Sequence, residues 1–163
     1  MAPEDLHFDR KSLRTVTGKN PAWAELALDC VAFANAQGGR LLIGIEDGFD
    51  APPPGQIIPP GLTEAVVKRL RELTVNVGLA ANITSAANGA ESLTLLVARA
   101  HGVASTSDGR YAIRIGDECK PVVGDDWTAC SRASNLVRAV SIPRPESQSP
   151  HRHCVFSGQS GHR

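Results

Sequence analysis

The segment VAFANAQGGRLLIGIEDG, residues 31–48, constrains the fold more than any other part of the sequence. Its first residues continue a run from Trp23 to Ala34 in which apolar side chains recur every three or four positions, the spacing of a helix. The pair Gly38-Gly39 can end that helix. Residues 40–46 are too continuously apolar for a half-exposed strand, so the sequence predicts a central strand that is buried on both faces. A helix joined by two glycines to such a strand predicts a domain in which helices pack against a sheet.

Weaker patterns on either side complete the predicted domain. Loose alternation over residues 3–13 predicts a short first strand, and Asn20-Pro21 is a typical start for the helix that follows. Thr63 can cap a second helix over residues 64–77, which carries one apolar stripe. Three further strands are predicted, in the segments LAANITS, SLTLLVARA and YAIRIG. The order β-α-β-α-β-β-β indicates an α+β fold, with a mixed or antiparallel sheet and two main helices.

The composition changes after Asp126. A chain of 163 residues with 42% apolar content is most simply one domain, which we place at residues 1–126. Residues 127–163 are rich in Ser, Pro, Arg and His, and we predict a disordered C-terminal tail. The tail is basic, with five Arg and three His against one acid, whereas residues 1–126 have a net charge of −4. The abrupt change suggests that the tail is out of frame, a hypothesis that resequencing the locus would test.

The sequence predicts a cytoplasmic protein without a membrane partner. The N-terminal residues contain no apolar run of the kind that a signal peptide needs. No segment approaches the roughly 18 consecutive apolar residues of a membrane helix. The four cysteines form no CxxC pair and are too dispersed for a disulfide framework, which favours a reducing compartment.

Three acidic residues form a candidate metal site. Glu4 and Asp9 flank the first predicted strand, and Asp47 follows the central strand. Neighbouring strands lie about 5 Å apart, so these carboxylates can converge if the two strands pair. Clustered carboxylates repel one another unless a cation neutralises them, and Mg²⁺ or Mn²⁺ held in this way can activate water for phosphodiester cleavage. Arg10, Lys11 and Arg40 lie nearby in the sequence and could hold a phosphate backbone.

A simpler interpretation of the same acids stays open. Asp47-Gly48 is an ordinary turn dipeptide. Glu4 and Asp9 can be solvated charges on an edge strand, where charges discourage aggregation.

Three sequence motifs point to one family. The segment EDLHFDRK, residues 4–11, resembles E-S-x-x-x-E-F-K, with acids at both acidic positions but Asp9 in place of Glu and Arg10 in place of Phe. A second pattern, A-F-A-N-x-x-G-G-x-x-x-x-G-x-x-D, is matched without a gap by Ala32, Phe33, Ala34, Asn35, Gly38, Gly39, Gly44 and Asp47. A third pattern, Y-x-x-R-x-G, is matched by Tyr111, Arg114 and Gly116. Together the segments resemble the Schlafen-type AlbA-like domain, over roughly residues 4–123.

The resemblance implies nucleic-acid binding. In some eukaryotic members it implies a metal-dependent endoribonuclease, whose catalytic and metal-binding carboxylates carry over to Glu4, Asp9 and Asp47. Many bacterial members have no established catalysis and are labelled DNA-binding, transcription-regulator or ATP-binding proteins. Among the other matched residues, we expect Asn35 to cap the helix end and Gly44 to admit a closely packed helix. Arg114 could face a phosphate or pair with Asp117 or Glu118.

The sequence therefore predicts a nucleic-acid-binding domain for DNA or RNA, with a carboxylate and divalent-metal phosphodiesterase site. The alternative is a non-catalytic module that binds proteins or a nucleotide such as ATP, including a homodimer formed through the sheet. No GxxxxGK[ST] motif is present, so nothing supports ATP hydrolysis of the P-loop kind.

Overall fold

The structure is a computed structural model that describes residues 6–122. The elements are β1 (Phe8–Lys11), α1 (Arg14–Thr17), α2 (Trp23–Asn35), β2 (Gly39–Ile43), α3 (Leu62–Leu73), β3 (Thr74–Val75), β4 (Gly78–Ser85), β5 (Glu91–Ala98), β6 (Ser105–Thr106), β7 (Ala112–Ile115) and β8 (Glu118–Pro121). The predicted α+β class is confirmed. Glu4, the predicted boundary at residue 126 and the predicted tail lie outside the described residues.

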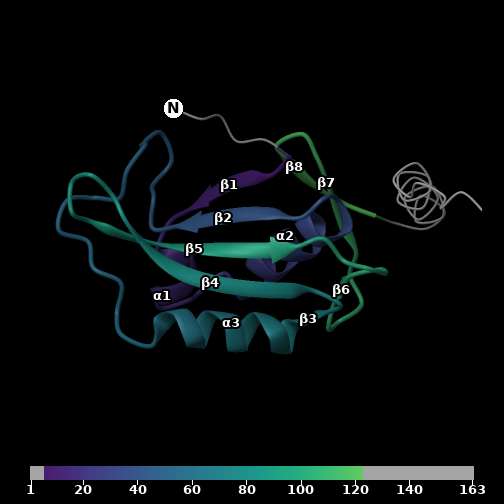
Figure 1. The fold of residues 1–163 in the computed structure, drawn as a ribbon. Helices are drawn as coiled ribbons and strands as arrows, with labels where there is room; N and C mark the ends of the chain where they lie inside the picture. Colours follow the sequence, from purple (N-terminus) through teal and green to yellow (C-terminus); the bar gives the residue numbers. More distant parts are fainter. Residues whose placement is uncertain (1–5, 123–163) are drawn as a thin grey trace, which may run out of the picture.

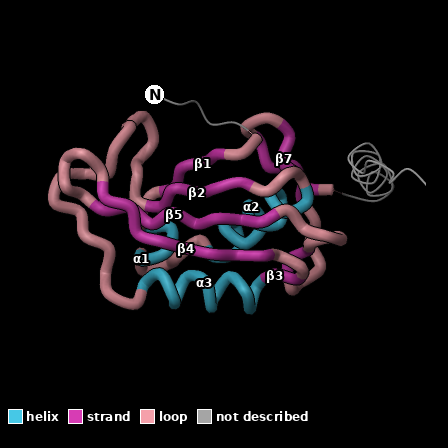
Figure 2. The backbone as a smooth tube through the Cα atoms, viewed as in Figure 1, coloured by secondary structure: helices cyan, strands magenta, loops and turns pink. Residues whose placement is uncertain are grey.

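The main sheet has four strands in the order β1-β2-β5-β4 (Figure 1). Strand β1 runs parallel to β2, whereas β5 runs antiparallel to both of its neighbours, β2 and β4, so the sheet is mixed, as predicted. Two small ribbons, β3 with β6 and β7 with β8, lie at one end of this sheet (Figure 2). Within residues 6–122, no helix has the length and apolar character that crossing a membrane requires.

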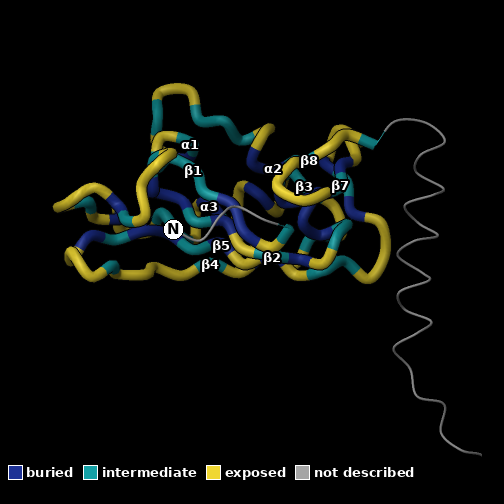
Figure 3. Tube along the Cα trace, turned by 90° about the horizontal axis from the view of Figure 1, so that it is seen from above, coloured by how far each residue is buried: buried dark blue, intermediate teal, exposed yellow. Residues whose placement is uncertain are grey.

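The helices lie on one face of the sheet only (Figure 3). Alternate residues of β2, β4 and β5 point to the helices and form the buried core together with α2 and α3. These residues are Leu41, Ile43, Leu79, Leu93, Leu95 and Val97. We call the opposite side the open face. It carries the intervening strand residues, which are Phe8, Arg10, Arg40, Leu42, Gly78, Ala80, Asn82, Thr84, Ser92, Thr94, Leu96 and Ala98.

The central strand is shorter and less buried than predicted. Strand β2 ends at Ile43, because Gly44 has a φ of +111° and turns the chain away from the sheet. Arg40 is exposed on the open face, so burial of β2 on both faces was wrong. The predicted packing role of Gly44 was also wrong, since a side-chain amide rather than a helix lies against it. Gln56 Nε2 donates hydrogen bonds to the carbonyl oxygens of Gly44 and Glu91, at 2.9 and 2.8 Å.

Helix α3 also ends earlier than predicted. It stops at Leu73 rather than continuing to residue 77, because Thr74–Val75 becomes β3 and pairs with Ser105–Thr106. Strand pairing of β3 with β6, about 30 residues further along the chain, thus replaces the last turn of the helix that the local apolar period predicted.

Gly38 performs the predicted role at the end of α2. Its N–H donates to the carbonyl oxygen of Phe33 at 2.8 Å, and its φ of +76° turns the chain directly into β2. A Cβ atom at Gly38 would lie 2.7 Å from the carbonyl oxygen of Val97 on β5. The position therefore needs glycine both for its backbone conformation and for the close approach of β5.

Asn35 joins separate elements and does not cap the end of α2 as predicted. Its Nδ2 donates to the carbonyl oxygens of Ala104 and Ala112, both at 2.9 Å, and its Oδ1 accepts from the N–H of Ala104 at 2.8 Å. The side chain thus satisfies backbone groups at β6 and β7, about 70 residues further along the chain.

Replacing Asn35 by alanine is expected to lower the free energy of unfolding by about 2 kcal/mol, because three backbone groups lose their partner. Urea unfolding followed by circular dichroism measures this loss. The matched control, Asn82→Ala on the exposed part of β4, is expected to stay within about 0.5 kcal/mol of wild type. Equal effects of the two substitutions would contradict the bridging role.

Candidate nucleic-acid interface

Strand β1 divides the predicted site residues between the two faces of the sheet. Neighbouring residues of a strand point to opposite faces. Asp9 and Lys11 point toward the helices, where Lys11 pairs with a residue of α2, and Phe8 and Arg10 point to the open face. Arg10 and Lys11, predicted to contact one phosphate backbone, therefore lie on opposite faces.

On the helix side, Asp9 and Lys11 belong to a buried network of charges. Lys11 Nζ lies 3.1 Å from a carboxylate oxygen of Asp9 and 3.2 Å from one of Asp29 on α2. Burial on its own lowers the pKa of Lys11, but the charges of Asp29 and Asp9 outweigh burial, so this pKa lies above its ordinary value. Asp9 is only 6% exposed, so its interpretation as a solvated edge charge was wrong.

Arg114 is the second cation of this network. Its guanidinium lies 3.7 Å from Asp9, donates to the carbonyl oxygen of Phe8 at 3.1 Å and to Cys119 Sγ at 3.2 Å, and covers the Phe33 ring. The side chain is 1% exposed. Residues of β7 alternate in burial, and Arg114 occupies an inward position, so it pairs with Asp9 rather than with Asp117 or Glu118. In this structure Arg114 joins β7 to β1 and does not reach the surface where a phosphate would bind.

Two thiols adjoin the same network. Burial and the negative charge of Asp29 raise the pKa of Cys119 to about 11. Burial, with Asp29 as a further cause, also raises the pKa of Cys30, which is fully buried on α2. Both thiols are therefore protonated at neutral pH, the less reactive form of the side chain.

On the open face, two arginines flank one aromatic ring. Arg40 is exposed and lies directly opposite Phe8 in the parallel pairing of β1 with β2. The guanidinium carbons of Arg10 and Arg40 lie 4.9 and 5.2 Å from the centroid of the Phe8 ring, within the range of a cation–π interaction. The Arg10 side chain is only 10% exposed and lies 3.9 Å from Asp50, so its charge is partly balanced. Arg40 therefore gives this face its most accessible positive charge.

The structure describes two of the three predicted carboxylates, Asp9 and Asp47. The main chain of Glu46–Phe49 closes a turn, in which Gly48 has a φ of +82°, so Asp47-Gly48 is the turn dipeptide that the simpler interpretation expected. Ser12 Oγ donates to Glu46 at 2.7 Å, which places this turn beside Ser12, the residue that follows β1.

The two described carboxylates of the predicted metal site lie in different surroundings. Asp9 is occupied by Lys11 and Arg114 on the helix side, and Asp47 is exposed in its turn. No group of three or more His, Cys, Asp or Glu side chains in the described part of the chain could hold a metal ion. Because Glu4 falls outside that part, the Mg²⁺ or Mn²⁺ site stays a prediction.

The sequence profile of the Schlafen AlbA_2 family matches residues 4–123, well over half of the chain. The chain belongs to the Schlafen AlbA_2 family. The fold is similar to that of the DIP2311 protein from Corynebacterium diphtheriae, known from a crystal structure, with a TM-score of 0.57 and 24% sequence identity. That match covers 82% of this chain but 30% of the other protein, so this chain spans less than a third of it. A search of curated proteins finds no match.

In this Schlafen AlbA_2 domain, several motif residues hold the fold together. Arg114 joins β7 to β1, Asn35 joins α2 to β6 and β7, and Gly38 lets α2 meet β5. Sequence reasoning missed Asp29 and Phe8 as site residues. Alternation within the predicted first strand could have placed Phe8 beside Arg10 on one face, whereas no local pattern marks Asp29 as the partner of Lys11.

Proposed function

We propose that this Schlafen AlbA_2 domain binds nucleic acid on the open face of its sheet, with Arg40 as the main phosphate contact. The observation that carries the proposal is the position of Arg40, exposed and stacked on Phe8, on the face that the helices leave uncovered. None of the strand residues described on that face is acidic, although the described chain as a whole has a net charge of zero. A phosphate backbone could therefore approach Arg40 without meeting a carboxylate from the sheet.

The rest of the open face suits a polymer with a sugar–phosphate backbone. Ala80 and Leu96 offer apolar area, and Asn82, Thr84 and Thr94 offer amide and hydroxyl groups that can bond to phosphates, sugars or bases. Large side chains are absent from the β4 part of this face, so an extended strand could lie flat against it. The proposal is nucleic-acid binding in which contacts to the phosphate backbone supply most of the affinity.

Replacing Arg40 by alanine is expected to weaken binding of labelled oligonucleotides several-fold at low salt. It should also reduce the slope of log K against log salt by about one, because one phosphate contact and its released counterion are lost. Fluorescence anisotropy with single-stranded RNA, single-stranded DNA and the two duplexes, over a salt series, measures both quantities.

The control is Arg69→Ala, which removes an exposed arginine that pairs with Glu72 on α3, in the helix layer. Equal losses from Arg40→Ala and Arg69→Ala would reduce the effect to net charge and contradict the proposed face. No binding of any oligonucleotide by the wild-type chain would favour a protein-interaction module.

Incubation with Mn²⁺ or EDTA tests the predicted nuclease separately, since cleavage that needs Mn²⁺ and is lost in Asp47→Ala would add catalysis to binding.

A further inference from the structure

Strand β4 is a long, uncharged edge of the sheet. It spans eight residues, Gly78–Ser85, and among residues 6–122 it pairs with β5 on one side only. Edge strands of this length usually carry lysine, proline or a bulge that prevents pairing with another chain. The sequence GLAANITS contains no charged residue and no proline, and Ile83 is 45% exposed.

The outer backbone groups of β4 belong to its odd-numbered residues. Arg71 Nη2 on α3 lies 3.4 Å from the carbonyl oxygen of Leu79, so this oxygen points away from β5. In an antiparallel pair, residues alternate between bonding inward and pointing outward, so the groups of Ala81, Ile83 and Ser85 point outward as well. The contact with Arg71 is longer than an ordinary hydrogen bond, so a strand with better geometry could replace it.

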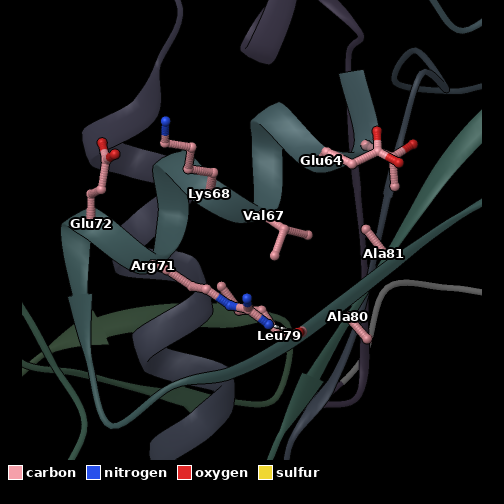
Figure 4. Close-up of a pocket in the computed structure, with 9 residues that line it drawn as sticks. Glu64, Val67, Lys68, Arg71, Glu72, Leu79, Ala80 and Ala81 are labelled. Carbon is pink, nitrogen blue, oxygen red and sulfur yellow. Dashed lines mark hydrogen bonds between the residues drawn. The ribbon is translucent and has the colours of Figure 1, made fainter. Parts of the chain in front are cut away.

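A groove of about 670 Å³ separates this edge from α3 (Figure 4). Val67, Leu79 and Ala81 give it an apolar lining. Its rim on α3 carries two acids and two bases, Glu64, Lys68, Arg71 and Glu72. Helix α3 thus borders the edge of β4 without pairing with it.

We propose that β4 pairs antiparallel with β4 of a second copy of this chain, which joins two sheets into one of eight strands. The charges favour an identical partner, because the uncharged strand does not repel its own copy. The groove rim is also balanced between acids and bases, so two copies of it can face each other with opposite charges in reach. The inference is independent of nucleic-acid binding.

The outward groups also select the register of the pairing. A two-fold axis through Asn82 pairs Leu79 with Ser85 and Ala81 with Ile83 of the other copy, so all four outward-pointing residues on each edge are bonded. An axis through Ala81 would leave the outward groups of Ser85 without a partner strand. With the axis at Asn82, the two Asn82 side chains lie directly opposite on the open face, about 5 Å apart.

Replacing Asn82 by lysine is expected to raise the dimer dissociation constant about tenfold or more, because two positive charges then face each other across the axis. Asn82→Asp is expected to have a similar effect. An equimolar mixture of the two variants is expected to restore a dimer, since lysine then faces aspartate. Sedimentation equilibrium of the full chain over a concentration series measures mass against the 17.2 kDa of one chain.

Leu96→Lys is the matched control, because it adds the same charge to the same face on β5, which is not an edge strand. It is expected to leave the dimer intact, and circular dichroism confirms that each variant is folded. A wild-type chain that stays monomeric at every concentration would overturn the proposal. A dimer that survives Asn82→Lys but is lost in Leu96→Lys would also overturn it, by placing the interface on the open face. Failure of the mixture to associate would overturn the register.

Discussion

Replacing Arg114 by leucine is expected to lower the free energy of unfolding by about 3–5 kcal/mol, the range found when one partner of a buried ion pair is removed. Leucine fills much of the space but cannot donate to the carbonyl oxygen of Phe8 or to Cys119. It also removes a positive charge beside Asp9, which is 6% exposed. Lys11 would remain as the cation for both Asp9 and Asp29. Urea unfolding monitored by circular dichroism gives the difference.

The matched control for this prediction is Arg110→Leu, four residues earlier in the chain and just before the motif that contains Arg114. Arg110 is 48% exposed in its side chain and pairs with the exposed Asp108 at 2.9 Å. Surface pairs of this kind contribute about 0–1 kcal/mol, so Arg110→Leu is expected to change stability little. A loss below about 1 kcal/mol for Arg114→Leu would contradict the buried network.

The same variant also tests whether Arg114 contacts nucleic acid. If its role is to hold β7 against β1, the folded fraction of Arg114→Leu should bind oligonucleotides with the wild-type salt dependence. A reduced salt slope in folded protein would show instead that Arg114 reaches a phosphate, against its burial in this structure.

Gly38→Ala is expected to cost about 3 kcal/mol of unfolding free energy, from two separate causes. The φ of +76° is unfavourable for any residue with a Cβ atom, at about 1 kcal/mol or more. The new Cβ would also lie 2.7 Å from the carbonyl oxygen of Val97 and 2.9 Å from the nitrogen of Arg99, both backbone atoms of the chain leaving β5. Backbone atoms cannot move aside as a flexible side chain can, so packing strain of about 1–3 kcal/mol adds to the conformational cost.

Gly89→Ala separates these two causes. Gly89 has nearly the same φ, +77°, but a Cβ atom there would meet nothing within 4 Å. This control is therefore expected to show the conformational cost alone, about 1 kcal/mol. The excess of Gly38→Ala over Gly89→Ala, measured by thermal and urea unfolding, reports the close approach of α2 to β5. Equal losses would mean that β5 moves away without cost.

Local sequence patterns predicted most of the elements. The 3.6-residue period located α2, the two glycines located its end, and apolar runs located β2, β4, β5 and β7. These features depend on residues close together in the chain. The two-residue strands β3 and β6 were missed because each exists only through the other, and 30 residues separate Thr74 from Ser105. The end of β2 was misplaced because the apolar pattern continues through Ile45 after the chain has left the sheet.

The candidate site was harder to predict, for two different reasons. The separation of Arg10 from Lys11 follows from strand alternation and could have been read from the predicted first strand. The burial of Arg114 could not, because it depends on Asp9 and Phe8, which lie more than 100 residues earlier. An exposed phosphate contact and a buried ion-pair partner require the same residue type, and only the tertiary fold distinguishes them.

The dependence of β1 on Arg114 has a consequence for biosynthesis. Strand β1 leaves the ribosome well before β7, yet the guanidinium that bonds Phe8 and neutralises Asp9 belongs to β7. Pairing of β1 with β2 becomes available early, but the buried carboxylate of Asp9 lacks one of its two cations until β7 has been made. A nascent chain that stalls before Ala112 would therefore hold an incomplete ionic network under its first strand. Such a chain already contains β2, β4, β5 and α2, which form most of the core. Because its first strand is not yet stabilised, we expect it to be more exposed to quality-control proteases than the full chain.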